Sequence, residues 1–445
     1  MIEFLLNVFR ESREDVAIVW HDHSFTYQWL TDSVSAWMTK LDNESIQPGS
    51  VVILEADFSP NAVALFLALV KRSCILVPLT NSVISQKNEF AEISQGEIKI
   101  LIDSDDLVIF EKMTQRADHA LYATLRERGH PGLVLFSSGS TGKSKAALHD
   151  LTGILEKFKV RRKKQRVITF LLYDHIGGIN TMFYSLSNGG CIITLQDRTP
   201  QSVLDAVQKY QVNLLPTSPT FINMILLSEA YRQYDLSSLK TVTYGTETMP
   251  ESTLKRFHQL FPAIELQQTY GLSEVGILRS KSKSSDSLWV RIGGEGFKTR
   301  IVDGILHIKA ESAMLGYLNA PSPFGEDGWF ITGDEVLEDG EYYQILGRRS
   351  ELINVGGEKV YPAEVESVLL LMHGVDDVVV GREANPISGQ IVVAKVNLST
   401  GETLSQFRKR MREFCKEKLS AYKIPQKIVL MDAPVYSPRF KKMRL

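Results

Sequence analysis

The residues with the clearest chemical potential lie in one stretch that is rich in hydroxyl groups and lysines. An apolar run, Leu133 to Phe136, predicts a buried strand, and a loop of small residues from Ser137 to Lys145 follows it. Small residues let the backbone approach a ligand closely, and successive N–H groups form a concave anion site. Hydroxyl and ammonium groups add charge-assisted hydrogen bonds. The stretch therefore predicts a loop that binds a polyphosphate.

Two sequence patterns compete for this loop. The P-loop pattern G-x-x-x-x-G-K-[ST] is met at its end by Gly142-Lys143-Ser144, but Ser137 stands where the first glycine is required. The loop also resembles the pattern [ST]-S-G-[ST]-T-G-x-P-K-G of the adenylate-forming enzymes, and departs from it at Ser144 and Ala146. That family includes acyl-CoA synthetases, peptide-synthetase adenylation domains and luciferases. The loop alone leaves both interpretations open, as well as a plain glycine–serine turn.

A second block, Gln268 to Glu274, resembles the [YF]-G-x-[TS]-E block of the adenylate-forming family. The Tyr270 ring offers a flat apolar partner to an adenine ring, and Gly271 allows close backbone approach. A hydroxyl at Ser273 can bond a phosphate oxygen, and the Glu274 carboxylate is the hard oxygen ligand that magnesium prefers. A tyrosine–glycine turn leading into a helix explains the block equally well when it is taken alone.

Two further blocks carry the resemblance toward the C-terminus. Trp329 to Asp334, with the later Gly347-Arg348, resembles [WYF]-x-x-T-G-D followed by G-R, although an ordinary β-hairpin is an alternative. A carboxylate held on a tight turn at Gly333-Asp334 suits two ribose hydroxyls, and Arg348 suits the ribose or a phosphate. Residues 347–366 resemble G-R-x-[DK]-x-x-I-K-x-x-G-x-x-[IV]-x-P-x-E-[IV]-E over their whole length, which is the most specific match in the sequence.

The tail, Pro434 to Leu445, resembles the family ending P-x-T-x-x-G-K-[ILV]-x-R only in part. It has one extra residue after the proline, and Phe440 occupies the usual glycine position. The K-x-x-R spacing returns at Lys441 and Arg444. The sequence leaves open whether Lys441 or Lys442 is the tail lysine, and a simple basic tail is the alternative.

Because these blocks follow the family's order from residue 133 to residue 445, the chain is identified as a member of the adenylate-forming superfamily. The resemblance implies that a carboxylate attacks the α-phosphate of Mg·ATP to give an acyl-adenylate and pyrophosphate. A thiol, from coenzyme A or from carrier-protein phosphopantetheine, then takes the acyl group. The expected substrate is a small carboxylic acid, the expected cofactors are ATP and Mg²⁺, and an acyl or peptidyl carrier protein is a candidate partner.

The resemblance also assigns roles to individual residues. It implies catalytic roles for Lys441, His175 and Glu274, with Glu274 as the magnesium ligand. The loop at Gly356-Gly357 is expected to enter the site for the thiol step, after a pivot near Ser350. The expected nucleotide-binding residues are Ser137, Ser138, Gly139, Ser140, Thr141, Gly142, Lys145, Tyr244, Gly245, Thr246, Thr269, Tyr270, Gly271, Ser273, Asp334, Tyr343 and Arg348.

Several positions leave the substrate and the second step open. His175 lies where many thioester-forming members carry a histidine, but a loop histidine without a catalytic role is an alternative. Asp174 lies near the aspartate with which amino-acid-activating members bind an α-ammonium group, although we favour a turn aspartate. Ser350 and Asn354 replace common family residues. The alternatives to an acid–thiol ligase are an amino-acid adenylation enzyme that loads a carrier protein and a non-catalytic adenylate-binding relative.

The overall composition is that of a globular protein with more than one domain. The chain has 445 residues, of which 44% are hydrophobic and 23% charged, and its net charge of −2 argues against a general nucleic-acid binder. Three widely spaced cysteines suggest neither a disulfide framework nor a metal site. No run is long enough to span a membrane, and the first residues do not resemble a signal peptide. We therefore expect a cytoplasmic protein.

The elements that must position these residues predict an α/β fold. Strands and helices alternate from Val51 to Thr269, which predicts doubly wound parallel sheets whose ligands bind at the carboxyl ends of the strands. Shorter strands after about residue 285 predict a β-rich subdomain, and residues from about 350 predict a small, mobile α+β unit. The expected domains are residues 1–348, for ATP and acid binding, and residues 350–445, with the hinge near Ser350.

Overall fold

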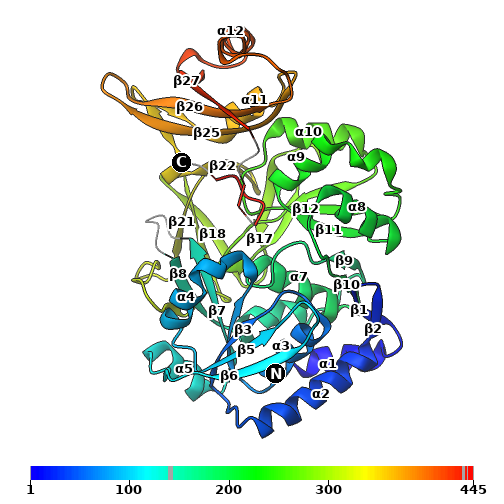
Figure 1. Cartoon of the computed structure of the whole chain (residues 1–445). Helices are drawn as coiled ribbons and strands as arrows, with labels where there is room; N and C mark the ends of the chain where they lie inside the picture. Colours follow the sequence, from blue (N-terminus) through cyan, green and yellow to red (C-terminus); the bar gives the residue numbers. More distant parts are fainter. Residues whose placement is uncertain (1, 139–143, 433–435, 438, 444–445) are drawn as a thin grey trace.

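The computed structural model describes residues 2–138, 144–432, 436–437 and 439–443. The N-terminal part forms the lower and middle regions of Figure 1, a β-rich region lies beside it, and residues after about 350 form a cap at the top. Among the helices of these described residues, none combines the length and the apolar character that crossing a bilayer requires.

The first large sheet carries the strand before the serine-rich loop. It has seven strands in the order β20-β8-β7-β4-β3-β5-β6, and the inner strands β7, β4, β3 and β5 are parallel. The antiparallel strands β8, β20 and β6 extend its edges. The bounds are β3 Val51–Glu55, β4 Ile75–Leu79, β5 Ile98–Ile102, β6 Val108–Lys112, β7 Gly132–Ser138, β8 Ser144–Asp150 and β20 Gly316–Tyr317.

The second large sheet supplies the other loops of interest. It also has seven strands, in the order β13-β12-β11-β9-β10-β1-β2, all parallel except for β2 at the edge. The bounds are β1 Val16–Trp20, β2 His23–Thr26, β9 Arg166–Ile168, β10 Cys191–Ile193, β11 Leu214–Thr217, β12 Thr241–Tyr244 and β13 Glu265–Gln268.

Helices cover the two sheets and form the core between them. The largest apolar cluster joins buried residues of α1, α2, α3 and α7 with residues of both sheets. Helices α3, α8 and α9 each begin with a Ser/Thr–Pro pair, in which the hydroxyl caps the first turn and the proline pre-sets its backbone. The bounds are α1 Glu3–Glu11, α2 Tyr27–Asn43, α3 Pro60–Lys71, α4 Lys87–Ile93, α5 Ala120–Arg128, α6 Leu151–Leu155, α7 Ile176–Ser187, α8 Pro200–Lys209, α9 Pro219–Ser228 and α10 Glu251–Leu260.

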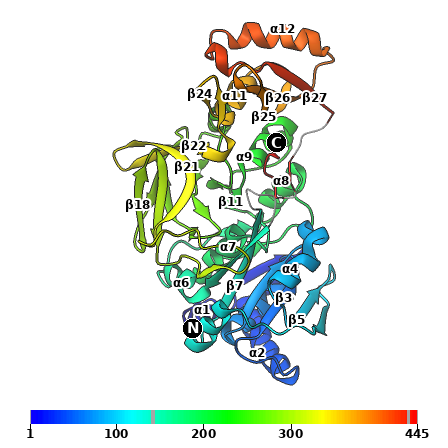
Figure 2. The ribbon, with the colours of Figure 1, turned by 90° about the vertical axis from the view of Figure 1, so that its left-hand side faces the viewer.

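The β-rich region follows the second sheet along the chain. A six-stranded antiparallel sheet has the order β16-β17-β22-β21-β19-β18, and a two-stranded ribbon, β14 and β15, precedes it. Figure 2 shows this sheet below the cap, at the left of the view. The bounds are β14 Gly271–Leu272, β15 Gly276–Ile277, β16 Arg279–Ser282, β17 Trp289–Gly293, β18 Phe297–Val302, β19 Ile305–Ala310, β21 Phe330–Asp339 and β22 Tyr342–Arg348.

The C-terminal cap is a small α+β unit with a core of its own. Its sheet has the order β24-β23-β26-β25, with β27 paired in parallel to β26, and α11 and α12 close its apolar core. The bounds are β23 Ile353–Val355, β24 Glu358–Val360, α11 Pro362–Leu369, β25 Val375–Asn385, β26 Gly389–Leu398, α12 Leu404–Cys415 and β27 Lys427–Met431. The single-turn helix Arg349–Glu351 connects this unit to β22 and contains the expected hinge residue Ser350.

The expected fold class is confirmed, with three local corrections. Helix α5, before the serine-rich loop, was not expected from the sequence. The segment after that loop is the strand β8, which was not expected from the sequence either. Gly333 and Asp334 lie inside the strand β21 instead of forming a turn, although Gly333 has a φ of 75° and the pairing with β22 shifts register just after Glu335.

Candidate active site

The serine-rich loop connects two antiparallel strands. β7 and β8 pair along their length, with Ser137 opposite Lys145 and Ser138 opposite Ser144. A P-loop joins a strand to a helix, so this connection contradicts the P-loop interpretation. Four of the expected phosphate ligands, Gly139, Ser140, Thr141 and Gly142, lie outside the described residues, as does Lys143.

Lys145 and Glu274 meet around a tyrosine that the motifs did not indicate. Tyr317, on β20, donates a hydrogen bond of 2.6 Å to Oε1 of Glu274, and Nζ of Lys145 lies 5.3 Å from the centre of the Tyr317 ring. The residue before Glu274 is also held in place: Nε2 of the buried His149 forms a hydrogen bond of 2.5 Å with the carbonyl oxygen of Ser273. The structure thus brings a lysine and a carboxylate together beside the serine-rich loop.

The expected ribose residues form a second group on the β-rich sheet. The Tyr270 hydroxyl donates to Oδ2 of Asp334 at 2.5 Å, and Nε of Arg348 lies 3.5 Å from Oδ1. Burial raises the pKa of Asp334, which the Arg348 charge and the Tyr270 hydrogen bond oppose. Tyr343 packs in the same apolar cluster as Tyr270, and its hydroxyl bonds to Thr299 at 3.1 Å.

The ends of β12 and β13 are bound tightly to each other. Thr269 donates hydrogen bonds to the Tyr244 carbonyl from its backbone N–H at 2.7 Å and from its hydroxyl at 3.1 Å. A Cβ atom on Gly245 would lie 2.6 Å from Oγ1 of Thr269, so this approach requires glycine. The Tyr244 side chain is buried in the core, whereas Thr246 is exposed and lines a pocket. Of Tyr244, therefore, only the backbone lies at the carboxyl end of β12 where a ligand could bind.

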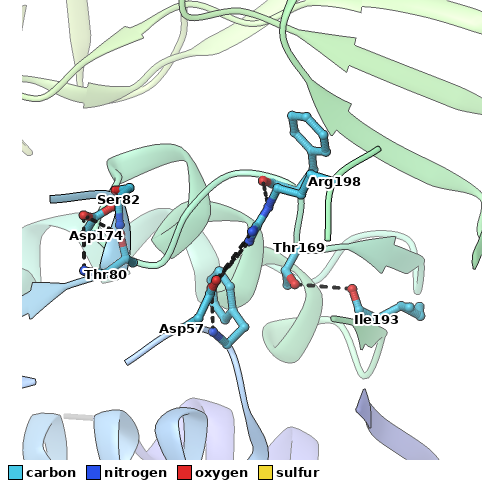
Figure 3. A network of polar contacts seen from close by, with 9 residues as sticks. Asp57, Thr80, Ser82, Thr169, Asp174, Ile193 and Arg198 are labelled. Atoms are coloured by element: carbon cyan, nitrogen blue, oxygen red, sulfur yellow. Dashed lines mark hydrogen bonds and ion pairs between the residues drawn. The ribbon is translucent and has the colours of Figure 1, made fainter. Parts of the chain in front are cut away.

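A polar network holds the segment that carries His175 (Figure 3). Arg198 donates from Nε to the carbonyl oxygen of Phe170 at 2.8 Å and pairs with Asp57 at 3.4 Å. Further along, the Thr80 hydroxyl donates to Oδ2 of the buried Asp174 at 3.0 Å. The segment is thus fixed at both ends, and His175 caps the start of α7, its Nδ1 accepting a hydrogen bond from the N–H of Gly177.

The C-terminal tail reaches this segment and completes a narrow pocket. Residues 170–172, His175 and Thr246 line one side, and Arg439, Phe440 and Lys441 of the tail line the other. Arg439 pairs with Asp174 at 3.3 Å, and the Ser218 hydroxyl donates to the Phe440 carbonyl at 2.7 Å. The Phe440 ring packs against Phe170 and Phe221, with ring centres 5.1 and 5.3 Å apart.

The two adjacent tail lysines take opposite directions. Lys441 lies in the pocket, where burial and the neighbouring Arg439 lower its pKa to about 8 while the Glu247 carboxylate opposes that shift. Lys442 instead points into the C-terminal cap, and its Nζ donates to the Val378 carbonyl at 2.7 Å. The geometry therefore makes Lys441 the lysine that faces the pocket, a point that the sequence left open.

His175 is a neutral histidine in this arrangement. Burial lowers its pKa well below the usual range, and the charges of Lys441 and Arg439 lower it further. Because Nδ1 accepts the hydrogen bond from Gly177, the ring proton of the neutral form lies on Nε2. His175 can therefore donate one hydrogen bond from Nε2 while it caps the helix with Nδ1.

The expected thiol-step loop does not line the pocket. Gly356 and Gly357 form an exposed turn between β23 and β24, with φ values of 62° and 95°. A Cβ atom at either position would have no other atom of the described chain within 4 Å. Asn354, which stands where the family pattern has a lysine, accepts a hydrogen bond of 2.8 Å from the N–H of Gly357 and so shapes the turn.

Comparison with known protein families identifies the family to which the chain belongs. A family model described as AMP-binding enzyme matches residues 7–317, and the model for the C-terminal domain of the AMP-binding enzymes matches residues 364–437. The chain belongs to the AMP-binding enzyme family. The resemblance to the adenylate-forming superfamily is thereby confirmed.

Relatives within this family are CoA ligases. The chain is 28% identical to an indoleacetate–CoA ligase of Aromatoleum aromaticum over 68% of its own length and 64% of that protein. It is 26% identical to 4-coumarate–CoA ligase 2 of Nicotiana tabacum over 79% of its own length and 71% of that protein. The chain thus matches about two thirds of the length of these relatives.

Solved structures share the fold over nearly the whole chain. An anthranilate CoA ligase in complex with anthranoyl-AMP superposes with a TM-score of 0.83 at 19% identity, covering 99% of this chain and 95% of that one. The o-succinylbenzoate CoA synthetase of Bacillus subtilis, in complex with its acyl-adenylate intermediate, gives 0.78 at 20% identity, covering 99% and 96%.

The structure adds residues of this family member that sequence reasoning missed. Tyr317 follows Gly316 in a stretch that no pattern singled out, although its pairing with β8 places it beside Lys145. Glu247 lies two residues beyond the expected Gly245, and its Oε1 accepts hydrogen bonds from the N–H and the hydroxyl of Thr220. Glu247 lies three residues after the end of the strand β12, where ligands bind in such sheets, and this position was the signal in the sequence that could have identified it.

Proposed function

We propose that the protein activates a carboxylic acid with ATP as an acyl-adenylate and then transfers the acyl group to a thiol, as an AMP-forming acid–thiol ligase. The observation that carries this proposal is the position of Lys441, which the tail places in a pocket with His175 and Thr246. A lysine in that place can contact both the acid and the α-phosphate. Membership of the AMP-binding family and the CoA ligases among its relatives support the same chemistry.

Charge stabilisation accounts for the first half-reaction. An oxygen of the substrate carboxylate attacks the α-phosphorus, and the bond to the β-phosphate oxygen breaks, so that pyrophosphate leaves. Lys441 would neutralise charge between the carboxylate and the α-phosphate, and Lys145 would hold the departing phosphates. Asp334 and Arg348 would orient the ribose, and Tyr270 would pack against the adenine.

Glu274 fits the role of a magnesium ligand in its chemistry. Its carboxylate is partly exposed, and one oxygen is oriented by Tyr317. Among the described residues, no three His, Cys, Asp or Glu side chains gather into a ready-made metal site. An ion at Glu274 would take its other ligands from nucleotide phosphates and water, as magnesium commonly does, and would neutralise developing phosphate charge.

The thiol step needs a different arrangement of the C-terminal cap. The sulfur of the acceptor attacks the acyl carbon, the thiol gives up its proton, and AMP leaves. We propose that residues 350–445 pivot near Ser350, so that Lys441 withdraws and the Gly356-Gly357 turn approaches the site. The exposure of that turn leaves it accessible for such a movement.

An acid without an α-amino group is the substrate that the pocket favours. Asp174, which could have bound an α-ammonium group, is already paired with Arg439 of the tail and hydrogen-bonded to Thr80. Both contacts are made to Oδ2, and the other oxygen, Oδ1, is buried without a hydrogen-bond partner among the described residues, so a substrate ammonium would have to reach a buried atom.

Pyrophosphate exchange over a panel of fatty, aryl and amino acids tests the proposal. We expect exchange with at least one acid that has no α-amino group, followed by thioester formation with coenzyme A. Exchange with no acid would contradict an enzymatic role and favour an adenylate-binding relative. Exchange with α-amino acids alone would favour an amino-acid adenylation enzyme. Transfer to the phosphopantetheine of a carrier protein, but not to coenzyme A, would identify the carrier protein as the acceptor.

A further inference from the structure

Lys442 is a buried lysine that the proposed reaction does not use. Its side chain is 6% exposed and lies between two buried carboxylates of the cap, 3.5 Å from Oε2 of Glu366 and 3.6 Å from Oδ1 of Asp377. Its Nζ also donates to the Val378 carbonyl at 2.7 Å. These partners come from α11 and from the start of β25, more than 60 residues before Lys442 in the sequence.

The contacts of Lys442 divide between the two sides of the site. Every side-chain partner given above belongs to the cap, whereas its backbone N–H donates to Oε2 of Glu247, beyond β12 of the N-terminal part, at 3.0 Å. Arg439 and Phe440 also dock on the N-terminal part, through Asp174 and Ser218. Lys442 is therefore the point at which the tail is attached to the body of the cap.

The chain needs such an attachment because its tail contains two lysines in succession. The family pattern has an aliphatic residue after the tail lysine, and here that position is Lys442. A shift of the tail by one residue would place the wrong lysine in the pocket. A buried ion pair adds little net stability, but leaving its carboxylates unpaired is costly, so it discriminates between alternative registers.

We propose that Glu366 and Asp377 select Lys442 and thereby fix the register of the tail, so that Lys441 and not Lys442 reaches the substrate. Lys442 is thus a positioning residue for acid activation. This inference deepens the proposed function and rests on it for its kinetic consequence. The docking of the tail can be measured by hydrogen exchange, which does not depend on the protein having the proposed activity.

The kinetic test compares Lys442→Met with Lys427→Met. Lys427 forms an exposed pair with Glu383 in the same sheet, so its replacement removes a lysine–carboxylate pair without touching the tail. We expect Lys442→Met to lower kcat of pyrophosphate exchange by about tenfold to a hundredfold, with KM for ATP changed less. Transfer from a preformed acyl-adenylate to the thiol should stay near the wild-type rate, as should both reactions of Lys427→Met. Lys442→Arg should recover part of the exchange activity.

The structural test is hydrogen exchange at the amides of residues 441 and 442. These amides donate to Ser437 and Glu247 in the docked tail, and we expect both to exchange faster in Lys442→Met and at the wild-type rate in Lys427→Met. Unchanged exchange of both amides would overturn the inference, even if the chain activated no acid. An equal loss of both half-reactions would also overturn it, because it would mark a general structural role.

Asp377→Asn provides a second variant if Lys442→Met does not fold. It keeps the lysine and Glu366 but removes one of the two charges that select the lysine. We expect a smaller fall in pyrophosphate exchange and faster exchange of the same two amides. A folded Asp377→Asn protein with wild-type values for both measurements would contradict the selection of Lys442 by this pair.

Discussion

Two segments of the C-terminal cap are proposed to act in catalysis, and they lie in opposite environments. The tail is docked, with Phe440 packed between two aromatic rings and Lys441 in the pocket. The Gly356-Gly357 turn is exposed and touches nothing in the described chain where a side chain would begin. Under the proposed roles, this arrangement serves acid activation, and the thiol step requires the cap to move.

Hydrogen bonds and ion pairs cross the junction between the two parts. The buried Glu335 of β21 accepts hydrogen bonds from Arg349, next to the proposed hinge, and from Lys359 and Tyr361 of the cap. Burial raises the pKa of Glu335, but these hydrogen bonds outweigh it and leave the pKa lowered. The carboxylate is therefore charged at neutral pH and pairs with the two cations across the junction.

The largest effect should come from the docked segment. Lys441→Ala removes the charge proposed to bridge the carboxylate and the α-phosphate, and we expect pyrophosphate exchange to fall by about 10²- to 10³-fold. Transfer from a preformed acyl-adenylate should change little, since we propose that the lysine withdraws in that step. Lys163→Ala, at an exposed position, serves as the control. Wild-type exchange in Lys441→Ala would show that the tail lysine is placed wrongly.

The exposed segment should give the reverse pattern. Gly357→Leu places a side chain at a φ of 95°, and we expect thioester formation to fall by about tenfold while pyrophosphate exchange stays within about twofold. Gly340→Leu is a matched control, because Gly340 is also exposed and has a φ of 60° in the turn between β21 and β22. If Gly357→Leu impaired exchange as strongly as transfer, the proposal that the tail serves acid activation and the turn serves the thiol step would be wrong.

The sequence predicted the elements whose signals are local. The buried strand before the serine-rich loop and the alternation of strands and helices from Val51 onward were expected where they occur. Helix α5 was missed because its sequence, ALYATLRER, has only a weak apolar face. Strand β8 was missed because it is a strand only through its pairing with β7 and β20. Such pairing is a property of the folded chain and leaves little trace in a seven-residue segment.

The same limit explains what was missed in the candidate site. Motif order placed Tyr270, Asp334 and Arg348 together, and the structure brings them into one group. Tyr317 reaches Glu274 across 43 residues, and the choice between the two tail lysines depends on carboxylates far away in the sequence. No spacing rule connects such partners, so only the fold could identify them.

The pH dependence of acid activation should follow the docked lysine. Its pKa is lowered to about 8 from the usual 10.5, so the ammonium form of Lys441 is lost as pH rises through about 8. We expect kcat/KM for ATP in pyrophosphate exchange to decline above that pH, since this parameter reports the free enzyme. Lys441→Arg, which stays charged, should move the decline to higher pH. An unchanged profile in Lys441→Arg would assign the decline to another group.

The smallest effect should arise at the junction that holds the two parts together. Glu335→Gln keeps the size of the side chain but removes the charge that pairs with Arg349 and Lys359, so the docked arrangement loses stability relative to the pivoted one. Each pair is half-exposed on the cationic side, and the expected change is about two- to threefold.

The sign of that change separates two explanations. If the junction biases the cap toward acid activation, exchange should slow while transfer from a preformed acyl-adenylate quickens or stays constant, because the variant shifts a population between two arrangements. Glu338→Gln, an exposed position on the same strand, should alter neither rate. A parallel fall in both half-reactions, together with a lower melting temperature, would instead mean that Glu335 stabilises the fold and does not discriminate between the docked tail and the exposed turn.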